Sequence, residues 1–108
     1  MARTYSRYTR EAATLLARQI RLGRKQCRWT ELELAERAGI SRATLQKIEK
    51  GELGVAIGLV FEVAVLVGVP LFEPESHSLT AHIARTDDRL ALLPSAVRKR
   101  GKPVDDDF

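Results

Sequence analysis

The chain has 108 residues, which suits one domain with short extensions and is too short for two separate hydrophobic cores. Hydrophobic residues make up 44% and charged residues 30%, which excludes a disordered chain and a membrane protein. The net charge of +4 is uneven: residues 1–50 hold twelve Lys and Arg against five acids, a charge of +7, whereas residues 51–108 hold six against nine. The basic N-terminal half, residues 1–50, predicts a polyanionic partner.

The first predicted helix starts at residue 10, after a polar and basic arm over residues 1–9 that we expect to be flexible. From residue 10 onward, apolar side chains recur at helical spacing as far as Ile20. Gly23 is expected to let this helix fray toward Cys27.

Two short helices are predicted next, on either side of one glycine. Thr30 offers its hydroxyl as the cap of the first, and Glu33 completes a capping box three residues later. Gly39 ends that helix, since it can adopt the left-handed conformation that a helix end requires, and Ser41 caps the next helix. The turn is too short for antiparallel stacking, so we expect the two helices to cross steeply as a helix-turn-helix.

The remainder of the chain predicts two more helices and no strand. One helix spans about residues 56–67, and the other runs from about residue 78 to residue 93, where Pro94 stops it. The predicted fold is all-α, with five helices between a flexible N-terminal arm and a flexible C-terminal tail over residues 94–108.

The helix-turn-helix predicts a rigid, basic helix on its outer side. Ala35 is small enough to let the two helices approach each other. Their shared core is expected to consist of four apolar residues, Leu34, Ile40, Leu45 and Ile48. The outward face then carries Arg42, Ala43, Gln46, Lys47 and Lys50. A rigid helix with such a face fits the major groove of DNA.

The spacing of residues between Ile20 and Gly51 is also that of a known family. The matched residues are Ile20, Arg24, Thr30, Leu34, Ala35, Gly39, Ser41, Leu45, Ile48, Glu49 and Gly51. In this pattern the chain resembles the Cro/C1-type (XRE) helix-turn-helix family. The resemblance implies a DNA-binding domain over residues 10–70, in which Arg24 and Glu49 form a structural ion pair.

The resemblance also implies which residues contact double-stranded DNA. The base-reading residues would be Arg42, Ala43, Gln46 and Lys47. Arginine or lysine can bond guanine edges, and alanine can pack against a thymine methyl. The DNA backbone would be contacted by Arg28, Thr30, Ser41 and Lys50, with Arg3, Arg7 and Arg10 of the arm as further candidates.

One position departs from the family's pattern. The family often has a glutamine directly after the helix cap at Thr30, where it contacts a phosphate and braces the first base-reading residue. This chain has Glu31 there, whose charge would repel a phosphate. We therefore expect Glu31 to orient Arg42 or Lys47 instead.

The helix predicted over residues 56–67 is apolar nearly all round, which predicts a covering surface beyond its own bundle. The expected cover is a second copy of the chain, because two-fold symmetric dimers of this size read palindromic operators. Residues 71–93 would form the rest of the dimerisation segment. The expected contact residues are Val60, Phe61, Val63, Leu66, Leu79 and Ile83. The alternative is a helix buried wholly within its own bundle.

Two further stretches, GVAIG at residues 54–58 and LLPSAVRKRGKPVDDDF at residues 92–108, resemble a subset of this family, the HipB-like antitoxins encoded beside HipA-type kinases. This resemblance implies a repressor of its own operon that also binds and inactivates a HipA-like serine/threonine kinase toxin. The toxin-binding tail residues would be Asp105, Asp106, Asp107 and Phe108. The alternatives are a pure kinase inhibitor, or a stand-alone phage-type dimeric repressor with a merely solubilising tail.

The sequence offers no candidate for catalysis, a cofactor or a metal. No paired carboxylates, nucleophile with a base, or phosphate-binding loop is present, and His77 and His82 do not stand at metal-ligand spacing. The single Cys27 and the lack of a signal segment favour a cytoplasmic protein. The apolar run over residues 55–72 contains Glu62 and turn-forming residues, which argues against a membrane span.

Overall fold

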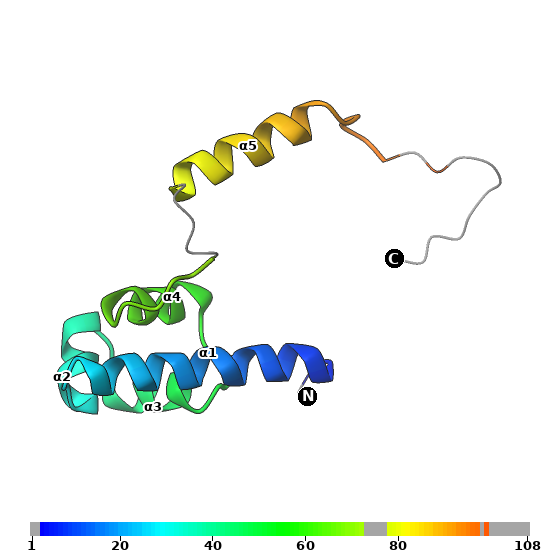
Figure 1. Cartoon of the computed structure of the whole chain (residues 1–108). Helices are drawn as coiled ribbons and strands as arrows, with labels where there is room; N and C mark the ends of the chain where they lie inside the picture. The colour runs from blue at the N-terminus through cyan, green and yellow to red at the C-terminus, as the bar shows by residue number, and fades with distance from the viewer. Residues whose placement is uncertain (1–2, 73–77, 98, 100–108) are drawn as a thin grey trace. The chain divides into compact units, whose positions relative to one another are not determined.

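The structure is a computed structural model that describes residues 3–72, 78–97 and 99. These residues contain five α-helices and no strand. The helices are α1 (Arg7–Gln26), α2 (Glu31–Ala38), α3 (Arg42–Glu49), α4 (Ile57–Leu66) and α5 (Leu79–Ala91) (Figure 1). The chain divides into two compact units, Met1–Glu73 with α1 to α4 and Pro74–Phe108 with α5. The expected all-α fold with five helices is confirmed.

The longest helix, α1, begins three residues earlier and continues further than the sequence pattern indicated. Ser6 caps it, because the Ser6 hydroxyl accepts a hydrogen bond from the Thr9 N–H at 3.1 Å. Residues 7–9, which we expected in the flexible arm, are therefore helical. At the other end, the helix passes through Gly23 without fraying and ends at Gln26.

The start and end of α2 follow the local signals in the sequence. The Thr30 hydroxyl accepts from the Glu33 N–H at 3.1 Å, and the Glu33 carboxylate accepts from the Thr30 N–H at 2.8 Å. Gly39 ends the helix with a φ of 71°, and Ser41 caps α3 by accepting from the Thr44 N–H. The predicted capping box and glycine terminus are confirmed.

One hydrophobic core holds the first unit together, and residues of α1, α2, α3 and α4 all contribute to it. Its buried residues are Ile20, Leu34, Ala35, Leu45, Ile48, Val63, Ala64, Val67 and Val69. Partly buried Trp29 and Ile40 pack against this cluster. α2 packs on α3 and α4, and α1 packs on α3. The helix that carries the basic face is therefore anchored on two sides.

Gly23 lies inside α1 because α1 and the end of α4 approach closely there. A Cβ atom on Gly23 would lie 2.7 Å from the Val67 carbonyl oxygen and 3.0 Å from the Val67 Cγ2. The glycine is needed for space, since only a residue without a side chain permits this contact. The sequence pattern alone suggested a helix end instead.

Replacing Gly23 with alanine is expected to destabilise the protein by up to about 2 kcal/mol. Overpacking costs about 1–3 kcal/mol, which outweighs the gain of about 1 kcal/mol that alanine makes as a helix former. Gly58 of α4 is a matched control, because a Cβ atom there would meet no other atom within 4 Å. Urea unfolding should therefore show Gly23→Ala to be less stable and Gly58→Ala to be at least as stable as the parent. Equal effects at the two positions would contradict the close approach.

Only part of the apolar surface of α4 is used by the core of the first unit. Val63 and Ala64 are buried, and Val60 and Leu66 are partly covered, whereas Ile57 remains 68% exposed. The placement of Val63 at a dimer contact is wrong, because its side chain is 0% exposed and belongs to the chain's own core. The inward positions of α4 were indistinguishable in sequence, since nearly all of them are apolar.

Helix α5 buries none of its own residues. It starts on a Ser78 cap, whose hydroxyl accepts from the Ala81 N–H at 3.2 Å, and it ends at Ala91. Leu79, Ile83 and other large apolar side chains of this helix are exposed. A helix of this length is marginal in water without tertiary contacts.

Candidate nucleic-acid interface

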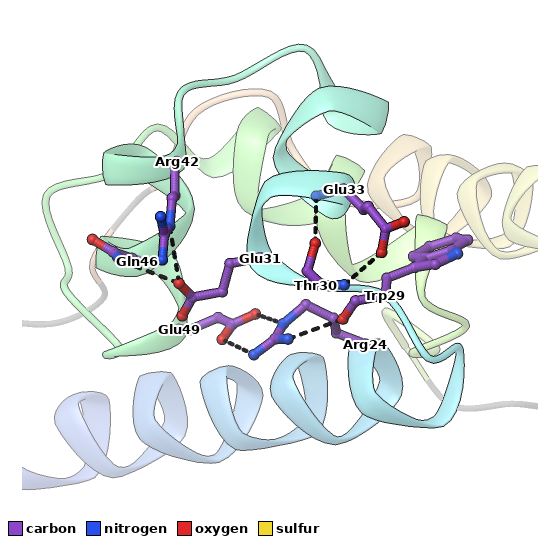
Figure 2. Close-up of polar contacts among 8 residues, drawn as sticks. All are labelled: Arg24, Trp29, Thr30, Glu31, Glu33, Arg42, Gln46 and Glu49. Atoms are coloured by element: carbon purple, nitrogen blue, oxygen red, sulfur yellow. Dashed lines mark hydrogen bonds and ion pairs between the residues drawn. The ribbon is translucent and has the colours of Figure 1, made fainter.

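A buried ion pair between Arg24 and Glu49 fixes the scaffold beneath the basic helix (Figure 2). The Arg24 Nε lies 2.7 Å from Glu49 Oε2, and the Arg24 Nη2 lies 3.0 Å from Glu49 Oε1. The Arg24 Nη1 donates to the Trp29 carbonyl at 3.0 Å. The hydrogen bond to Glu49 raises the pKa of Arg24 above its usual value. The structure thus joins the end of α1, the turn before α2 and the end of α3 through the pair that the resemblance implies.

The outward face of α3 carries the four residues expected to read bases. Leu45 and Ile48 are buried in the core, so the opposite side of the helix faces solvent. On that side Arg42, Ala43 and Lys47 are exposed and Gln46 is half-buried. The structure therefore places the four expected base-reading residues on one short, anchored helix.

Glu31, the first residue of α2, contacts two of these four residues. Its Oε1 accepts a hydrogen bond from the Gln46 Nε2 at 3.1 Å and lies 3.3 Å from the Arg42 Nε (Figure 2). The hydrogen bond from Gln46 is the largest cause that lowers the pKa of Glu31 below its usual value, and the hydrogen bond from Arg42 lowers it further. Desolvation of the carboxylate opposes this shift but does not cancel it. The contact with Arg42 agrees with one of the two expectations for Glu31. The contact with Gln46 was missed, because no local pattern relates residues 15 positions apart.

The residues expected to contact the DNA backbone lie at or near helix ends. The hydroxyls of Thr30 and Ser41 serve as helix caps and already accept backbone N–H groups. Lys50, the residue that caps the end of α3, is exposed. Arg28 is also exposed, and its φ of 64° makes it the only residue other than glycine with a positive φ in the described part of the chain.

Arg28 adopts this conformation because it ends α1 where a glycine is commonly found. The Arg28 N–H donates to the Lys25 carbonyl at 3.0 Å, and the Trp29 N–H donates to the Arg24 carbonyl at 3.2 Å. These are the two hydrogen bonds of a left-handed helix terminus. Arg28 therefore adopts a backbone conformation that favours glycine.

Replacing Arg28 with glycine is expected to stabilise the protein by up to about 1 kcal/mol while weakening its binding to DNA. Stability rises because glycine relieves the left-handed strain. If Arg28 contacts a phosphate as predicted, affinity should fall alike for all sequences, and the slope of log K against log salt should become shallower by about one. Arg28→Ala is the matched control, since it removes the charge and keeps the strain. A glycine variant less stable than the alanine variant would count against this explanation.

The basic residues near the N-terminus are the remaining candidates for phosphate contacts. Arg7 and Arg10 lie in the first turn of α1 and make contacts within the chain, since Arg10 Nη1 donates to the Tyr5 carbonyl at 2.6 Å and Arg7 pairs with Glu11 at 3.3 Å. The expected toxin-binding residues, 105–108, lie outside the described residues.

Neither a metal centre nor a membrane segment accompanies this face in residues 3–72, 78–97 and 99. Within them, no three His, Cys, Asp or Glu side chains come together as metal ligands would. None of the helices in these ranges has the length and apolar content needed to cross a membrane.

Comparisons with known proteins agree with this geometry. Residues 20–73, half of the chain, match the family described as Helix-turn-helix. Among solved structures, the chain is similar to a HipB variant in complex with an O2 20mer, with a TM-score of 0.51 and 25% sequence identity over 71% of this chain and 99% of that chain. The comparison with curated proteins gave no match. The chain therefore belongs to the Cro/C1-type helix-turn-helix family, whose domains bind DNA and are not enzymes.

Proposed function

We propose that this chain is a sequence-specific transcriptional repressor that inserts α3 into the major groove of its operator. The observation that carries this proposal is the exposed face of α3, with Arg42 and Lys47 held on a helix that the buried pair of Arg24 and Glu49 anchors. A rigid helix that presents basic and amide side chains matches the dimensions and the hydrogen-bonding pattern of the major groove. A repressor of this kind acts in the cytoplasm.

The proposed contacts divide into two classes. Arg42, Ala43, Gln46 and Lys47 would contact base edges and determine the sequence. Arg28, Thr30, Ser41 and Lys50 would contact phosphates, which position the protein and give the affinity its salt dependence.

The repressor would act as a homodimer on a palindromic operator. Exposed apolar residues on α4 and α5 support this proposal, among them Ile57, Leu79 and Ile83. Leu79, Ile83 and Leu90 stand four and seven residues apart on α5, so they share one exposed apolar side of the helix. The same side of α5 in a second copy would cover it. Two-fold symmetry would then place the two α3 helices on two half-sites.

The dimer proposal can be tested on α5 with two charge insertions. Ile83→Glu is expected to shift the protein toward monomer in sedimentation equilibrium and to weaken operator binding. Ala84→Glu adds the same charge one residue along, where the side chain leaves the helix in a different direction, and should leave the dimer intact. An Ile83→Glu variant with an unchanged association constant would remove α5 from the interface.

Within this class, we propose that the chain is the antitoxin of a type II toxin-antitoxin pair, which represses its own operon and neutralises a HipA-like serine/threonine kinase. The similarity to the HipB variant supports this proposal, because it extends over 99% of that chain and also includes part of this chain beyond the helix-turn-helix match. The alternative is a stand-alone phage-type repressor with no toxin partner.

Co-expression with the protein encoded beside it would separate these two functions. The antitoxin proposal predicts a complex that survives tagged pull-down and size exclusion and still shifts the upstream promoter DNA. Promoter binding with no retained partner would favour the stand-alone repressor. A complex that cannot bind the promoter, together with a free chain that cannot bind it either, would leave a kinase inhibitor and contradict the repressor.

The tail provides a second test of the antitoxin role. Deleting residues 104–108, which removes Asp105, Asp106, Asp107 and Phe108, should weaken the complex with the kinase at least tenfold, which corresponds to about 1.4 kcal/mol. Operator affinity should change less than twofold, since the anchored face of α3 is unaltered. Isothermal titration with each partner measures both effects. A kinase complex of unchanged affinity would exclude the tail from the interface.

A further inference from the structure

One carboxylate holds two base-reading side chains at once. Oε1 of Glu31 accepts from the Gln46 Nε2 at 3.1 Å and lies 3.3 Å from the Arg42 Nε, so both donors converge on the same oxygen (Figure 2). The Glu31 side chain is 29% exposed and that of Arg42 is 60% exposed. The cluster therefore lies at the edge of the α3 face and not in the core.

An ionised carboxylate only accepts hydrogen bonds, which decides the orientation of the Gln46 amide. The NH2 group must face Glu31, because the amide oxygen would be repelled by it. Figure 2 shows the Gln46 oxygen on the side away from Glu31. A glutamine at position 31 would not impose this choice, because its own amide could either donate or accept.

The groups of Arg42 and Gln46 that do not bind Glu31 determine which base edges these two side chains can contact. Arg42 keeps the two Nη groups for a bidentate contact, which suits the two acceptors on the major-groove edge of guanine. Gln46 keeps its oxygen and one N–H, which match the donor and the acceptor of adenine. With its amide held in this way, Gln46 cannot offer both N–H groups to the two acceptors of guanine.

We propose that Glu31 is a specificity-determining positioning residue, which fixes the orientation of the Gln46 amide and thereby selects a base with a donor group opposite Gln46. This inference rests on the proposed binding of α3 to DNA bases. While it increases selectivity, Glu31 should lower the affinity of the protein for DNA, because a negative charge beside the DNA backbone repels phosphates. The opposite effects on affinity and on selectivity distinguish this role from a purely structural one, in which Glu31 would only stabilise the start of α2.

The test compares Glu31→Gln with Glu36→Gln, which removes the same charge from an exposed position on the same helix. Each full-length variant is selected on duplex DNA randomised across the operator, and the base preference at every position is read by sequencing. Glu31→Gln should bind random DNA more tightly than the parent and lose about tenfold in discrimination at the base opposite Gln46, within the range for one bidentate contact. Glu36→Gln should keep the preference of the parent.

The outcomes separate this inference from the proposed function. A parent protein that selects no sequence overturns the proposed function, and the role of Glu31 falls with it. A parent that selects an operator, beside a Glu31→Gln variant with an identical preference at every position, overturns the role of Glu31 alone. Equal losses in both variants would assign the effect to charge and also overturn it.

A measurement on the free protein checks the cluster without DNA. The side-chain NH2 resonances of Gln46 should shift as the Glu31 carboxyl titrates, with a midpoint below the usual pKa of a glutamate. The shift should be absent in Glu31→Gln and present in Glu36→Gln. Gln46 resonances that ignore the titration of Glu31 would contradict the hydrogen bond on which the positioning depends.

Discussion

Replacing Arg24 with alanine is expected to remove much of the protein's stability, at a cost of about 3–5 kcal/mol in the free energy of unfolding. The variant leaves Glu49 buried as an unpaired charge, because both of its carboxylate oxygens bond to Arg24. It also removes the donor to the Trp29 carbonyl. Natural domains have a total unfolding free energy on the order of 5–15 kcal/mol, so the loss would be easy to measure. Urea unfolding can be followed by the fluorescence of Trp29, the only tryptophan.

Two further variants show whether the loss comes from an unpaired buried charge. Glu49→Gln keeps the size of the side chain and strands the charge of Arg24, so it should also be strongly destabilising. Replacing Arg24 with methionine and Glu49 with leucine together should cost less than either single change, because no buried charge remains. A cost below about 1 kcal/mol for Arg24→Ala, which is typical of exposed ion pairs, would contradict the anchoring role of this pair.

Replacing Arg42 with alanine is expected to weaken operator binding by about 1–3 kcal/mol and to relax the choice at one base position. Arg42 has an exposed side chain on α3, and its Nη groups are not used by Glu31, whose contact is with Nε. Binding of the variant should be measured by fluorescence anisotropy on the operator and on operators that carry each single base change. The loss of discrimination should be confined to one position in each half-site.

Lys50→Ala is the matched control for this prediction. Lys50 is exposed at the end of the same helix and is assigned to a phosphate. Its replacement should weaken binding to all sequences alike and reduce the salt dependence by about one unit of slope. An Arg42→Ala variant that weakens all sequences equally, as Lys50→Ala does, would show that Arg42 contacts the backbone and not a base.

Those parts of the fold that local chemistry determines could be predicted from the sequence. Thr30 with Glu33 forms a capping box within four residues, and Gly39 takes a left-handed conformation that few other residues tolerate. Ser41 caps α3 in the same local manner. These signals fix the ends of α2 and α3 without information from the rest of the chain, so the position of the basic face could be derived.

The features that depend on packing could not be read from the sequence in the same way. Gly23 predicts a helix end as readily as a close approach, and only the position of Val67 shows which of the two applies. On α4, Val63 and Val65 are both apolar, yet the first is buried and the second is exposed. A helix that is apolar all round carries no periodicity to show its inward side.

The candidate site also contains features that the sequence could predict and one that it could not. The exposed positions on α3 follow from its cap and from the buried residues Leu45 and Ile48, so the expected set could be named in advance. The bond between Glu31 and Gln46 joins two helices across a turn, and its geometry depends on their crossing. From the sequence, Glu31 was expected to pair with a basic side chain because their charges are opposite. Opposite charge does not point to the neutral amide of Gln46, so this partner was missed.

The most direct test of the central claim is selection by the full chain from a pool of randomised duplex DNA. If the chain is a dimer that reads bases through α3, the enriched sequences will contain two inverted half-sites with centres about one helical turn, or 10–10.5 base pairs, apart. In the Arg42→Ala variant, enrichment at one position of each half-site will be lost. Binding that depends on salt concentration but enriches no sequence would contradict the claim that this face recognises an operator.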